Sequence, residues 1–374
     1  MKKKVLFVAS VDKEHILKFH IPFLKYFKDN NYEVHVACAG NEEIPFCDKK
    51  FILPFARNPF KLSNFTAFKM LKEILNYNDY SIIHCHTPIG GVVGRLAARH
   101  FRSKGIKVIY TAHGFHFFKG APLLNWIIYY PIEKLLAKYT DCLITINSED
   151  YKLATKRKFK AKNITLVHGV GVDINKFSQI EKEKKIVLRK RNGFNSNDFI
   201  IIYPAELTKN KNQQLLIHAL VKVRESVPNV KLLLPGIDHL DGYYQQIAKK
   251  YGVADNVFFL GWRNDINELV ALSDVAVASS IREGLGINLI EAIACGKAII
   301  AKNNRGHREL IKNGENGFLV SDEITMADKI IELFRFPKLL GDFENKSSSM
   351  INLYSIENVL KEMDEVYKRY MTNS

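Results

Sequence analysis

Short runs of β-branched and other apolar residues alternate along the chain with longer stretches in which apolar residues recur every three or four positions. In the first half, the helical spacing is clearest at residues 21–28 and 62–75. The short runs predict buried strands at residues 5–9, 33–37, 82–85, 108–111 and 142–146. Strands that alternate with helices in this way are typical of an α/β fold with a doubly wound parallel sheet.

The pattern pauses and then starts again in the second half. Residues 176–198 are rich in lysine, arginine and glutamate and predict an exposed hinge region. After them, strands are predicted at residues 199–203, 231–234, 257–260, 275–278, 298–301 and 317–320. We therefore expect two Rossmann-like domains, at 1–178 and 179–354.

The last segment, residues 355–374, has apolar residues at helical spacing and is expected to return to the N-terminal domain. Two facing domains of this kind would bring the carboxyl ends of their strands, where open α/β sheets bind ligands, to a shared cleft.

Composition supports a folded protein of two domains. The chain has 374 residues, of which 47% are hydrophobic and 25% charged. Asp12 interrupts the apolar run after Lys4 too early for a signal peptide, and we expect no membrane-spanning segment. The five cysteines are scattered and never form a C-x-x-C pair, which fits a reducing cytoplasm.

The positive charge is concentrated in the first half of the chain. Residues 1–178 contain 28 lysines and arginines against 14 acidic residues, whereas residues 179–374 contain 27 against 25. A basic field on one domain attracts phosphate groups, whether of nucleic acid, anionic lipid or a diphosphate-linked substrate.

The most specific motif is R-E-G-L-G-I-N-L-I-E-A at residues 282–292, directly after a predicted strand. Its two glycines favour a sharp turn, and the helix that follows would offer free N–H groups to an anion. Glu283 and Glu291 would then accept hydrogen bonds from sugar hydroxyls on either side of the phosphates. Neither a dinucleotide fingerprint nor a P-loop is present, so hydride transfer and P-loop chemistry are not expected.

Glu283 and Glu291, with seven residues between them, resemble the E-x7-E signature of retaining GT-B glycosyltransferases of family 4. Further resemblances lie at residues 167–173, at 257–265 and at 304–311, where Glu309 occupies the place of an acidic residue. Residues 108–151 resemble the branch that builds bacterial capsule, exopolysaccharide and glycans on lipid carriers. The resemblance implies a GT-B fold and metal-independent transfer from a nucleotide diphosphate sugar.

The resemblance also implies roles for individual residues of the second domain. Glu283 would contact the donor sugar, and Lys211 would neutralise the leaving diphosphate. The implied donor-binding residues are Arg263 for the base, the N–H groups of Gly286, Ile287 and Asn288 for the diphosphate, and Glu291 for the ribose.

One position departs from the family pattern. Glu206 stands where the family has an arginine that contacts the diphosphate, so we expect it to point away or to pair with a cation. Arg305, Lys209 or Arg282 would take over the missing contact.

In the first domain, the resemblance places His113 at the reaction centre. His84 and His86 follow the family's H-x-H, and we expect one of them to face the acceptor while the other packs. Three histidines could hold a metal, but no D-x-D pair occurs, and we expect neither a metal nor a cofactor. Acceptor contacts are expected from His86, Phe115, His116 and Lys119.

Aromatic residues and Lys119 at 115–130 could form either a surface for the anionic cytoplasmic leaflet or an ordinary buried helix. The hypothesis is a peripheral cytoplasmic transferase that moves a hexose or N-acetylhexosamine to an undecaprenyl-diphosphate-linked glycan. The expected donor is a UDP-sugar, and GDP-mannose is the second candidate. A GT-B epimerase or phosphorylase is the alternative, and a non-enzymatic basic membrane-binding protein the third. We expect no nucleic-acid partner, because zinc knuckles and base-reading helices are missing from the sequence.

Overall fold

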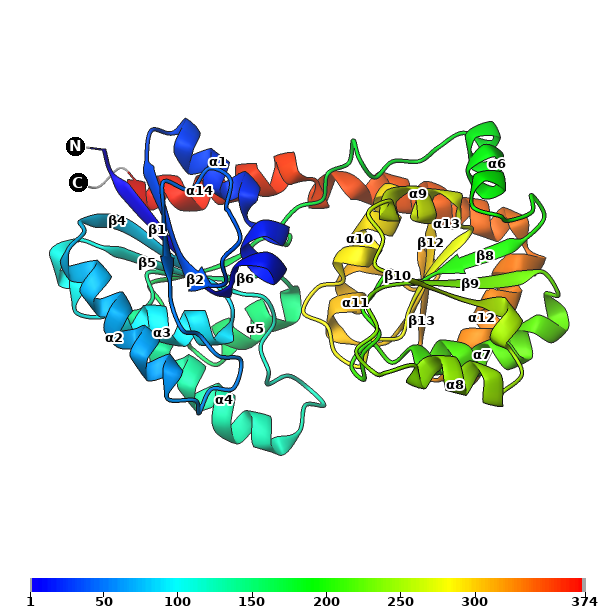
Figure 1. The fold of residues 1–374 in the computed structure, drawn as a ribbon, viewed down its shortest axis with the longest axis horizontal. Helices are drawn as coiled ribbons and strands as arrows, with labels where there is room; N and C mark the ends of the chain where they lie inside the picture. The colour runs from blue at the N-terminus through cyan, green and yellow to red at the C-terminus, as the bar shows by residue number, and fades with distance from the viewer. Residues whose placement is uncertain (1, 372–374) are drawn as a thin grey trace. The chain divides into compact units, whose positions relative to one another are not determined.

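The computed structural model describes residues 2–371, and the chain divides into two compact units (Figure 1). The N-terminal unit comprises the described residues up to Gly171 together with those from Ile356 on, and the C-terminal unit runs from Val172 to Ser355. Each unit is built around a parallel sheet with helices packed against it, as the alternating pattern predicted. The division follows Gly171, whereas the sequence placed it after residue 178.

The sheet of the N-terminal unit has seven strands in the order β3-β2-β1-β4-β5-β6-β7, all parallel. The strands are β1 (Lys4–Val11), β2 (Glu33–Ala39), β3 (Lys49–Ile52), β4 (Tyr80–Cys85), β5 (Lys107–Ala112), β6 (Cys142–Thr145) and β7 (Asn163–Leu166). Because β1 has β2 on one side and β4 on the other, the strand order reverses there. Such a switch point opens a crevice at the carboxyl ends of the two strands.

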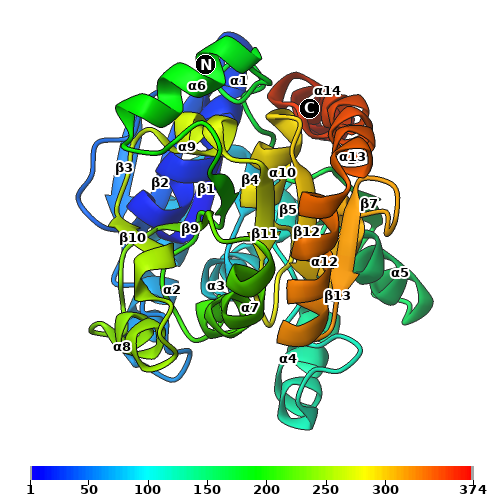
Figure 2. The same cartoon turned by 90° about the vertical axis from the view of Figure 1, so that its right-hand side faces the viewer.

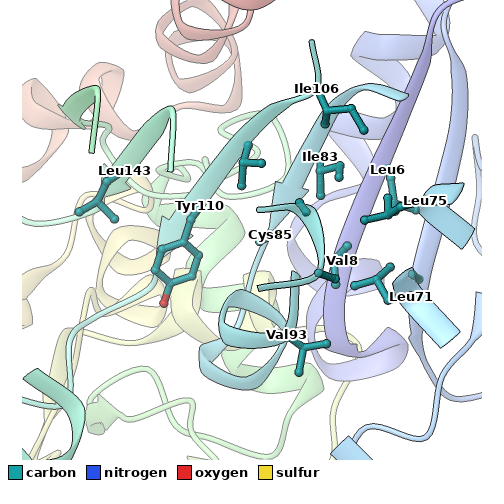
Figure 3. Packing of buried hydrophobic residues seen from close by; sticks show 14 of the residues in the cluster. Leu6, Val8, Leu71, Leu75, Ile83, Cys85, Val93, Ile106, Tyr110 and Leu143 are labelled. Carbon is teal, nitrogen blue, oxygen red and sulfur yellow. The ribbon is translucent and has the colours of Figure 1, made fainter. Parts of the chain in front are cut away.

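Helices cover both faces of this sheet. They are α1 (Ile21–Asp29), α2 (Ser63–Asn76), α3 (Pro88–Ala98), α4 (Leu123–Leu136), α5 (Ser148–Lys156) and α14 (Ile356–Met371), with a π-helical segment, Asp12–Leu17, after β1. Successive strand residues point to opposite faces, so Leu6 and Val8 pack under α2 and α3 while Val5 and Phe7 pack under α1 and α14. Figure 3 shows the first of these two cores, with Leu71 beside Val8.

The terminal helix α14 belongs to the N-terminal unit, as its apolar spacing predicted. Val359, Met363, Val366 and Tyr367 are buried in the core under α1. The Tyr26 hydroxyl on α1 donates to Asp364 at 2.6 Å.

The C-terminal unit has six parallel strands in the order β10-β9-β8-β11-β12-β13. The strands are β8 (Phe199–Ile202), β9 (Val230–Pro235), β10 (Val257–Gly261), β11 (Val275–Ala278), β12 (Ala298–Lys302) and β13 (Gly317–Val320). The helices are α6 (Lys182–Arg191), α7 (Gln213–Ser226), α8 (Tyr243–Lys250), α9 (Ile266–Leu272), α10 (Ile287–Ala294), α11 (Arg305–Leu310), α12 (Glu323–Arg335) and α13 (Pro337–Met350). Helices α7 and α12 lie side by side, as Figure 2 shows. The switch point of this sheet lies between β8 and β11.

Two features of the fold differ from the sequence prediction. The edge strands β3 and β7 were not predicted, because their residues are mostly half-exposed and include few of the apolar residues that marked the inner strands. The stretch 176–198, predicted as a hinge, contains helix α6, whose lysines and arginines are good helix formers without an apolar stripe. Among the described residues, no helix is long and apolar enough to span a bilayer.

Candidate active site

Lys211 and Glu283 meet at the switch point of the C-terminal sheet. Lys211 follows β8 and Glu283 follows β11, and their Nζ and Oε1 atoms lie 2.6 Å apart. The Lys211 side chain is 26% exposed and that of Glu283 15%. A cation and a carboxylate are therefore held where an open α/β sheet binds its ligand.

Hydrogen bonds between the two loops hold these side chains together. The Ile281 N–H donates to the Asn210 carbonyl at 2.8 Å, and the Asn210 side chain donates to the Arg282 carbonyl at 3.1 Å. The Ser279 hydroxyl donates to the Lys211 carbonyl at 2.9 Å. These bonds fix the backbone of the Lys211 loop against that of Glu283.

The stretch expected to bind the diphosphate forms the start of helix α10. Gly286 is the N-cap, and the N–H groups of Ile287 and Asn288, at the start of the helix, have no acceptor within it. The side-chain amide nitrogen of Asn288 is buried and has no hydrogen-bond partner within residues 2–371. Glu291 lies one turn further along and is partly buried. The start of α10 thus offers several donors to an anion.

Gly286 was expected to provide flexibility for a sharp turn, but its backbone angles do not require a glycine. Gly286 has φ −83° and ψ 90°, which any residue can adopt, so the turn does not require its flexibility. Gly306, in α11, is the glycine that close packing requires, since a Cβ there would lie 2.8 Å from the Glu283 Cβ.

Helix α11 supports the Glu283 loop from the other side. The Arg305 guanidinium donates to the Glu283 carbonyl at 3.2 Å, and Asn304 donates to the Ser280 carbonyl at 2.9 Å. His307 is buried beside them, and burial lowers its pKa to about 4, so it is neutral. Of the three cations expected to replace the family arginine, Arg305 contacts this loop through its side chain, whereas Lys209 and Arg282 are exposed.

Arg263 and Glu206 also lie beyond strand ends of this unit. Arg263 makes two contacts with the Asp265 carboxylate, one of them 2.7 Å long, so its guanidinium is already paired. Glu206 is about half-exposed, and its carboxylate lies 3.5 Å from the His239 ring. That Glu206 avoids the phosphate site stays a prediction.

Five histidines gather at the switch point of the N-terminal sheet. We call them the histidine cluster: His15, His20, His84, His86 and His113. His15 follows β1 and His20 is the N-cap of α1, while His86 and His113 follow β4 and β5. The nitrogens of His15 and His20 lie 3.1 Å apart, and those of His86 and His113 3.5 Å apart.

The cluster is buried and uncharged. Burial holds the pKa of His15, His20 and His86 well below the usual value of 6.5, and the neighbouring histidines lower it further. Burial also lowers the pKa of His113 to about 4. At neutral pH the rings therefore carry lone pairs and act as hydrogen-bonding groups or ligands.

The two histidines of the H-x-H pair have separate environments. His84 is enclosed, with Tyr367 at 2.9 Å from one ring nitrogen and Thr111 at 2.8 Å from the other. His86 contacts His113 instead, and its Nε2 atom has no partner in the described part of the chain. A pocket lined by His20, His84, His86, Thr111 and His113 opens here. His84 is thus the packed member of the pair, and the expectation that His86 faces the acceptor stays a prediction.

Among the acceptor residues expected after β5, Phe115 requires a correction. Its side chain is 3% exposed and stacks on Phe117 in the core, so it cannot contact an acceptor. His116 is half-buried with its ring tilted against that of Tyr129, and Lys119 is exposed. The error arose because the sequence pattern T-A-H-G-F-H-F-F does not show which aromatic rings turn inward.

Sequence reasoning missed several residues of these two sites. His15 and His20 were not considered, although His15 follows the predicted strand 5–9; His20 lies further on, at the start of α1. Asn304 and His307 were quoted only as part of a motif, yet Asn304 donates to the Ser280 carbonyl before the Glu283 loop and the His307 N–H donates to the Asn304 side chain. Polar residues that follow the strands on either side of a switch point would have been the signal.

Comparison with known proteins identifies the family. The model described as "Glycosyl transferase 4-like" matches residues 4–147, and "Glycosyl transferases group 1" matches residues 184–350. EpsD of Bacillus subtilis is 45% identical over 373 residues, covering 99% of this chain and 98% of its own. An undecaprenol-linked α-1,3-galactosyltransferase of Escherichia coli, named for UDP-Gal and a GlcNAc-diphosphoundecaprenol acceptor, is 27% identical over 92% of this chain and 90% of its own.

Solved structures agree on the fold. HepE of Anabaena, crystallised with UDP and glucose, superimposes with a TM-score of 0.81 at 19% identity, covering 98% of this chain and 100% of its own. Together with the two family models and the two parallel-sheet units, this likeness confirms the predicted GT-B fold. The chain belongs to the GT-B glycosyltransferases of the group 1 and family 4-like kind.

Proposed function

We propose that this transferase moves a hexose or N-acetylhexosamine, with retention of the anomeric configuration, from a UDP-sugar to an undecaprenyl-diphosphate-linked glycan. The part of the proposal that concerns the sugar donor rests on one observation. Lys211 contacts Glu283 beside the N–H groups at the start of helix α10. UDP is supported by HepE, which was crystallised with it, and the acceptor class by the name of the E. coli relative.

The proposed chemistry needs few protein groups. As the bond between the anomeric carbon and the diphosphate breaks, negative charge grows on the diphosphate, where Lys211 and the first-turn N–H groups of α10 stabilise it. The acceptor hydroxyl attacks on the same face and its proton passes to the leaving phosphate. Glu283 and Glu291 would hold hydroxyls of the sugar and ribose, with Arg305 steadying the Glu283 loop.

No metal or cofactor takes part in this proposal. Lys211 supplies a fixed cation where a metal-dependent transferase would place its ion. Arg263, paired with Asp265, would help to form the base pocket through the backbone around it. His113 and His86 would line the acceptor side.

We further propose that the enzyme works at the cytoplasmic face of the membrane through helix α4. Leu123, Leu124 and Ile127 are 74%, 62% and 61% exposed, whereas Trp126 packs on the core. Lys119 is exposed shortly before them. An apolar face on a basic domain suits an anionic leaflet, where each basic residue near the surface contributes about 1 kcal/mol.

The donor is tested by a thermal-shift screen of nucleotide sugars. A ligand present at 100 times its Kd stabilises the fold by about 2.7 kcal/mol, so binders raise the melting temperature. The stabilising sugar is then incubated with and without an undecaprenyl-diphosphate saccharide. Acceptor-dependent release of UDP, with the α configuration kept in the product, is expected. Epimerised sugar formed without acceptor would support the epimerase alternative and refute transfer.

The membrane face is tested by sedimentation with anionic vesicles. Leu124→Glu is expected to weaken binding to phosphatidylglycerol vesicles about tenfold or more, because it places a negative charge in the apolar face. Ile324→Glu, at a 61% exposed position of α12, is the matched control and should bind as the wild type does. Equal binding by both variants would show that α4 is not the docking face.

A further inference from the structure

Four histidines of the cluster are arranged as a set of metal ligands. His15, His20, His86 and His113 each offer one ring nitrogen, and these atoms all lie within 4.8 Å of one another. We call them the four-histidine set. They come from three separate strand ends, so the fold, and not one local motif, brings them together.

The spacing of the nitrogens fits a tetrahedral ion. Two nitrogens that bind Zn²⁺ at 2.0–2.1 Å in tetrahedral geometry lie about 3.3 Å apart. The His15–His20 distance is 3.1 Å and the His86–His113 distance 3.5 Å. Two edges of the tetrahedron are therefore already formed.

The environment also favours an ion. His20 and His86 are 1% exposed. The short distances involve Nε2 of His20 and Nδ1 of His86, and the other nitrogen of each ring, Nδ1 of His20 and Nε2 of His86, has no hydrogen-bond partner among residues 2–371. A buried polar atom without a partner costs about 1–3 kcal/mol, so the protein alone leaves one nitrogen of each of these two rings unsatisfied, and it is not the nitrogen of the short distances. A small pocket lies beside His20, His86 and His113.

The ligand type defines which ions would bind. Four neutral imidazoles with neither carboxylate nor thiolate suit zinc, nickel, copper and cobalt, and do not suit magnesium or calcium, which prefer oxygen ligands. His84 is excluded from the set, because Tyr367 and Thr111 occupy both of its nitrogens.

We propose that the four-histidine set binds one divalent transition-metal ion of the zinc class, and that the bound ion inhibits sugar transfer. The ion occupies the nitrogen of His113 that faces the cluster and draws His86 into coordination, so neither ring is available to substrates. The binding half stands on the geometry alone, whereas the inhibitory half rests on the proposed function, in which these two rings line the acceptor side.

Binding is tested with the full chain after removal of metal by a chelator. Titration with Co²⁺ is expected to give the intense visible absorption of four-coordinate cobalt, saturating at one ion per chain, and Zn²⁺ should displace it. His15→Gln and His20→Gln should each weaken Co²⁺ binding at least tenfold, as the loss of a ligand does. His100→Gln, which removes an exposed histidine outside the set, is the matched control and should bind as the wild type does.

A ligand-retaining variant guards against misfolding. His15→Cys keeps a metal ligand and should add a thiolate-to-cobalt charge-transfer band, which a purely structural role of His15 would not produce. Weak six-coordinate cobalt spectra, or equal affinity in the wild type and His15→Gln, would overturn the site.

Inhibition is measured separately, as the donor turnover of each protein relative to its own metal-free rate. Stoichiometric Zn²⁺ should lower wild-type turnover at least tenfold, a chelator should restore it, and His15→Gln should respond only at tenfold higher Zn²⁺. Saturated binding without loss of turnover would overturn the inhibitory half. Cobalt binding does not require the nucleotide sugar. A protein that gives the four-coordinate cobalt spectrum but has no transferase activity would therefore refute the proposed function and leave the metal site standing.

Discussion

Replacing Lys211 with methionine should separate a catalytic role from a structural one. The Lys211–Glu283 contact is 2.6 Å long, but the two side chains are 26% and 15% exposed. A partly exposed ion pair contributes about 0–1 kcal/mol to the free energy of unfolding. A fixed donor at the site of growing charge, by contrast, lowers the activation barrier by about 2.7–4 kcal/mol. Lys211→Met should therefore reduce kcat about 100- to 1,000-fold and leave stability almost unchanged.

The assay is release of nucleoside diphosphate at saturating donor and acceptor, combined with thermal unfolding of the same samples. The C-terminal unit supplies a matched control. Lys222 on α7 makes a contact of equal length, 2.6 Å, with Asp328, but both side chains are about half-exposed. Lys222→Met removes the same charge from the same unit, and its kcat should stay within twofold of the wild type.

Two outcomes would refute this reasoning. If Lys211→Met kept the wild-type kcat, Lys211 would be a partner of Glu283 and not a stabiliser of the leaving group. If Lys211→Met instead lost more than about 2 kcal/mol of stability, the pair would hold the fold, and the low turnover would follow from unfolding.

Two further predictions concern stability. Arg95 is fully buried and bound to Glu133 at 2.8 Å. Arg95→Met leaves the Glu133 carboxylate without its partner and should lower the free energy of unfolding in urea by about 3–5 kcal/mol. Adding Glu133→Gln should recover part of that loss, and a double variant whose loss equals the sum of the two single losses would contradict this. Burial would raise the pKa of Asp274, but Lys185 and Arg189 bring it below the usual value. Below about pH 4 the unfolded state therefore takes up a proton that the folded state does not, so the free energy of unfolding decreases as the pH is lowered. Asp274→Asn should be less stable than the wild type at pH 7. In urea titrations at acid pH, its stability should decrease less steeply as the pH is lowered.

The inner strands of both sheets could be predicted because they are buried on both faces. The run 275–278, for example, is apolar at every position and matches β11 without error. The edge strand β3 has lysines at its first two positions and no apolar alternation, so its pairing with β2 depends on a neighbour 14 residues earlier in the chain. Local pattern does not contain that information.

The two candidate sites differed in how far the sequence revealed them. Lys211 and Glu283 were placed in one site through a family motif, but their direct contact was not foreseen, since it depends on hydrogen bonds between loops 72 residues apart. Phe115 was assigned to the surface for a related reason. The direction in which a ring points after a strand is decided by packing, here against Phe117 and Phe159.

The order of the strands locates members of the histidine cluster that no sequence motif marks. His86 and His113 follow predicted strands and were found, and the same rule applied to the strand at 5–9 would have found His15. The rule fails for His20, which lies nine residues beyond the end of β1 and belongs to the start of α1. Between β1 and His20 the chain forms the π-helical segment Asp12–Leu17, which itself carries His15. In this fold, side chains of the first switch point therefore come from the irregular segment after the first strand as well as from the strand ends.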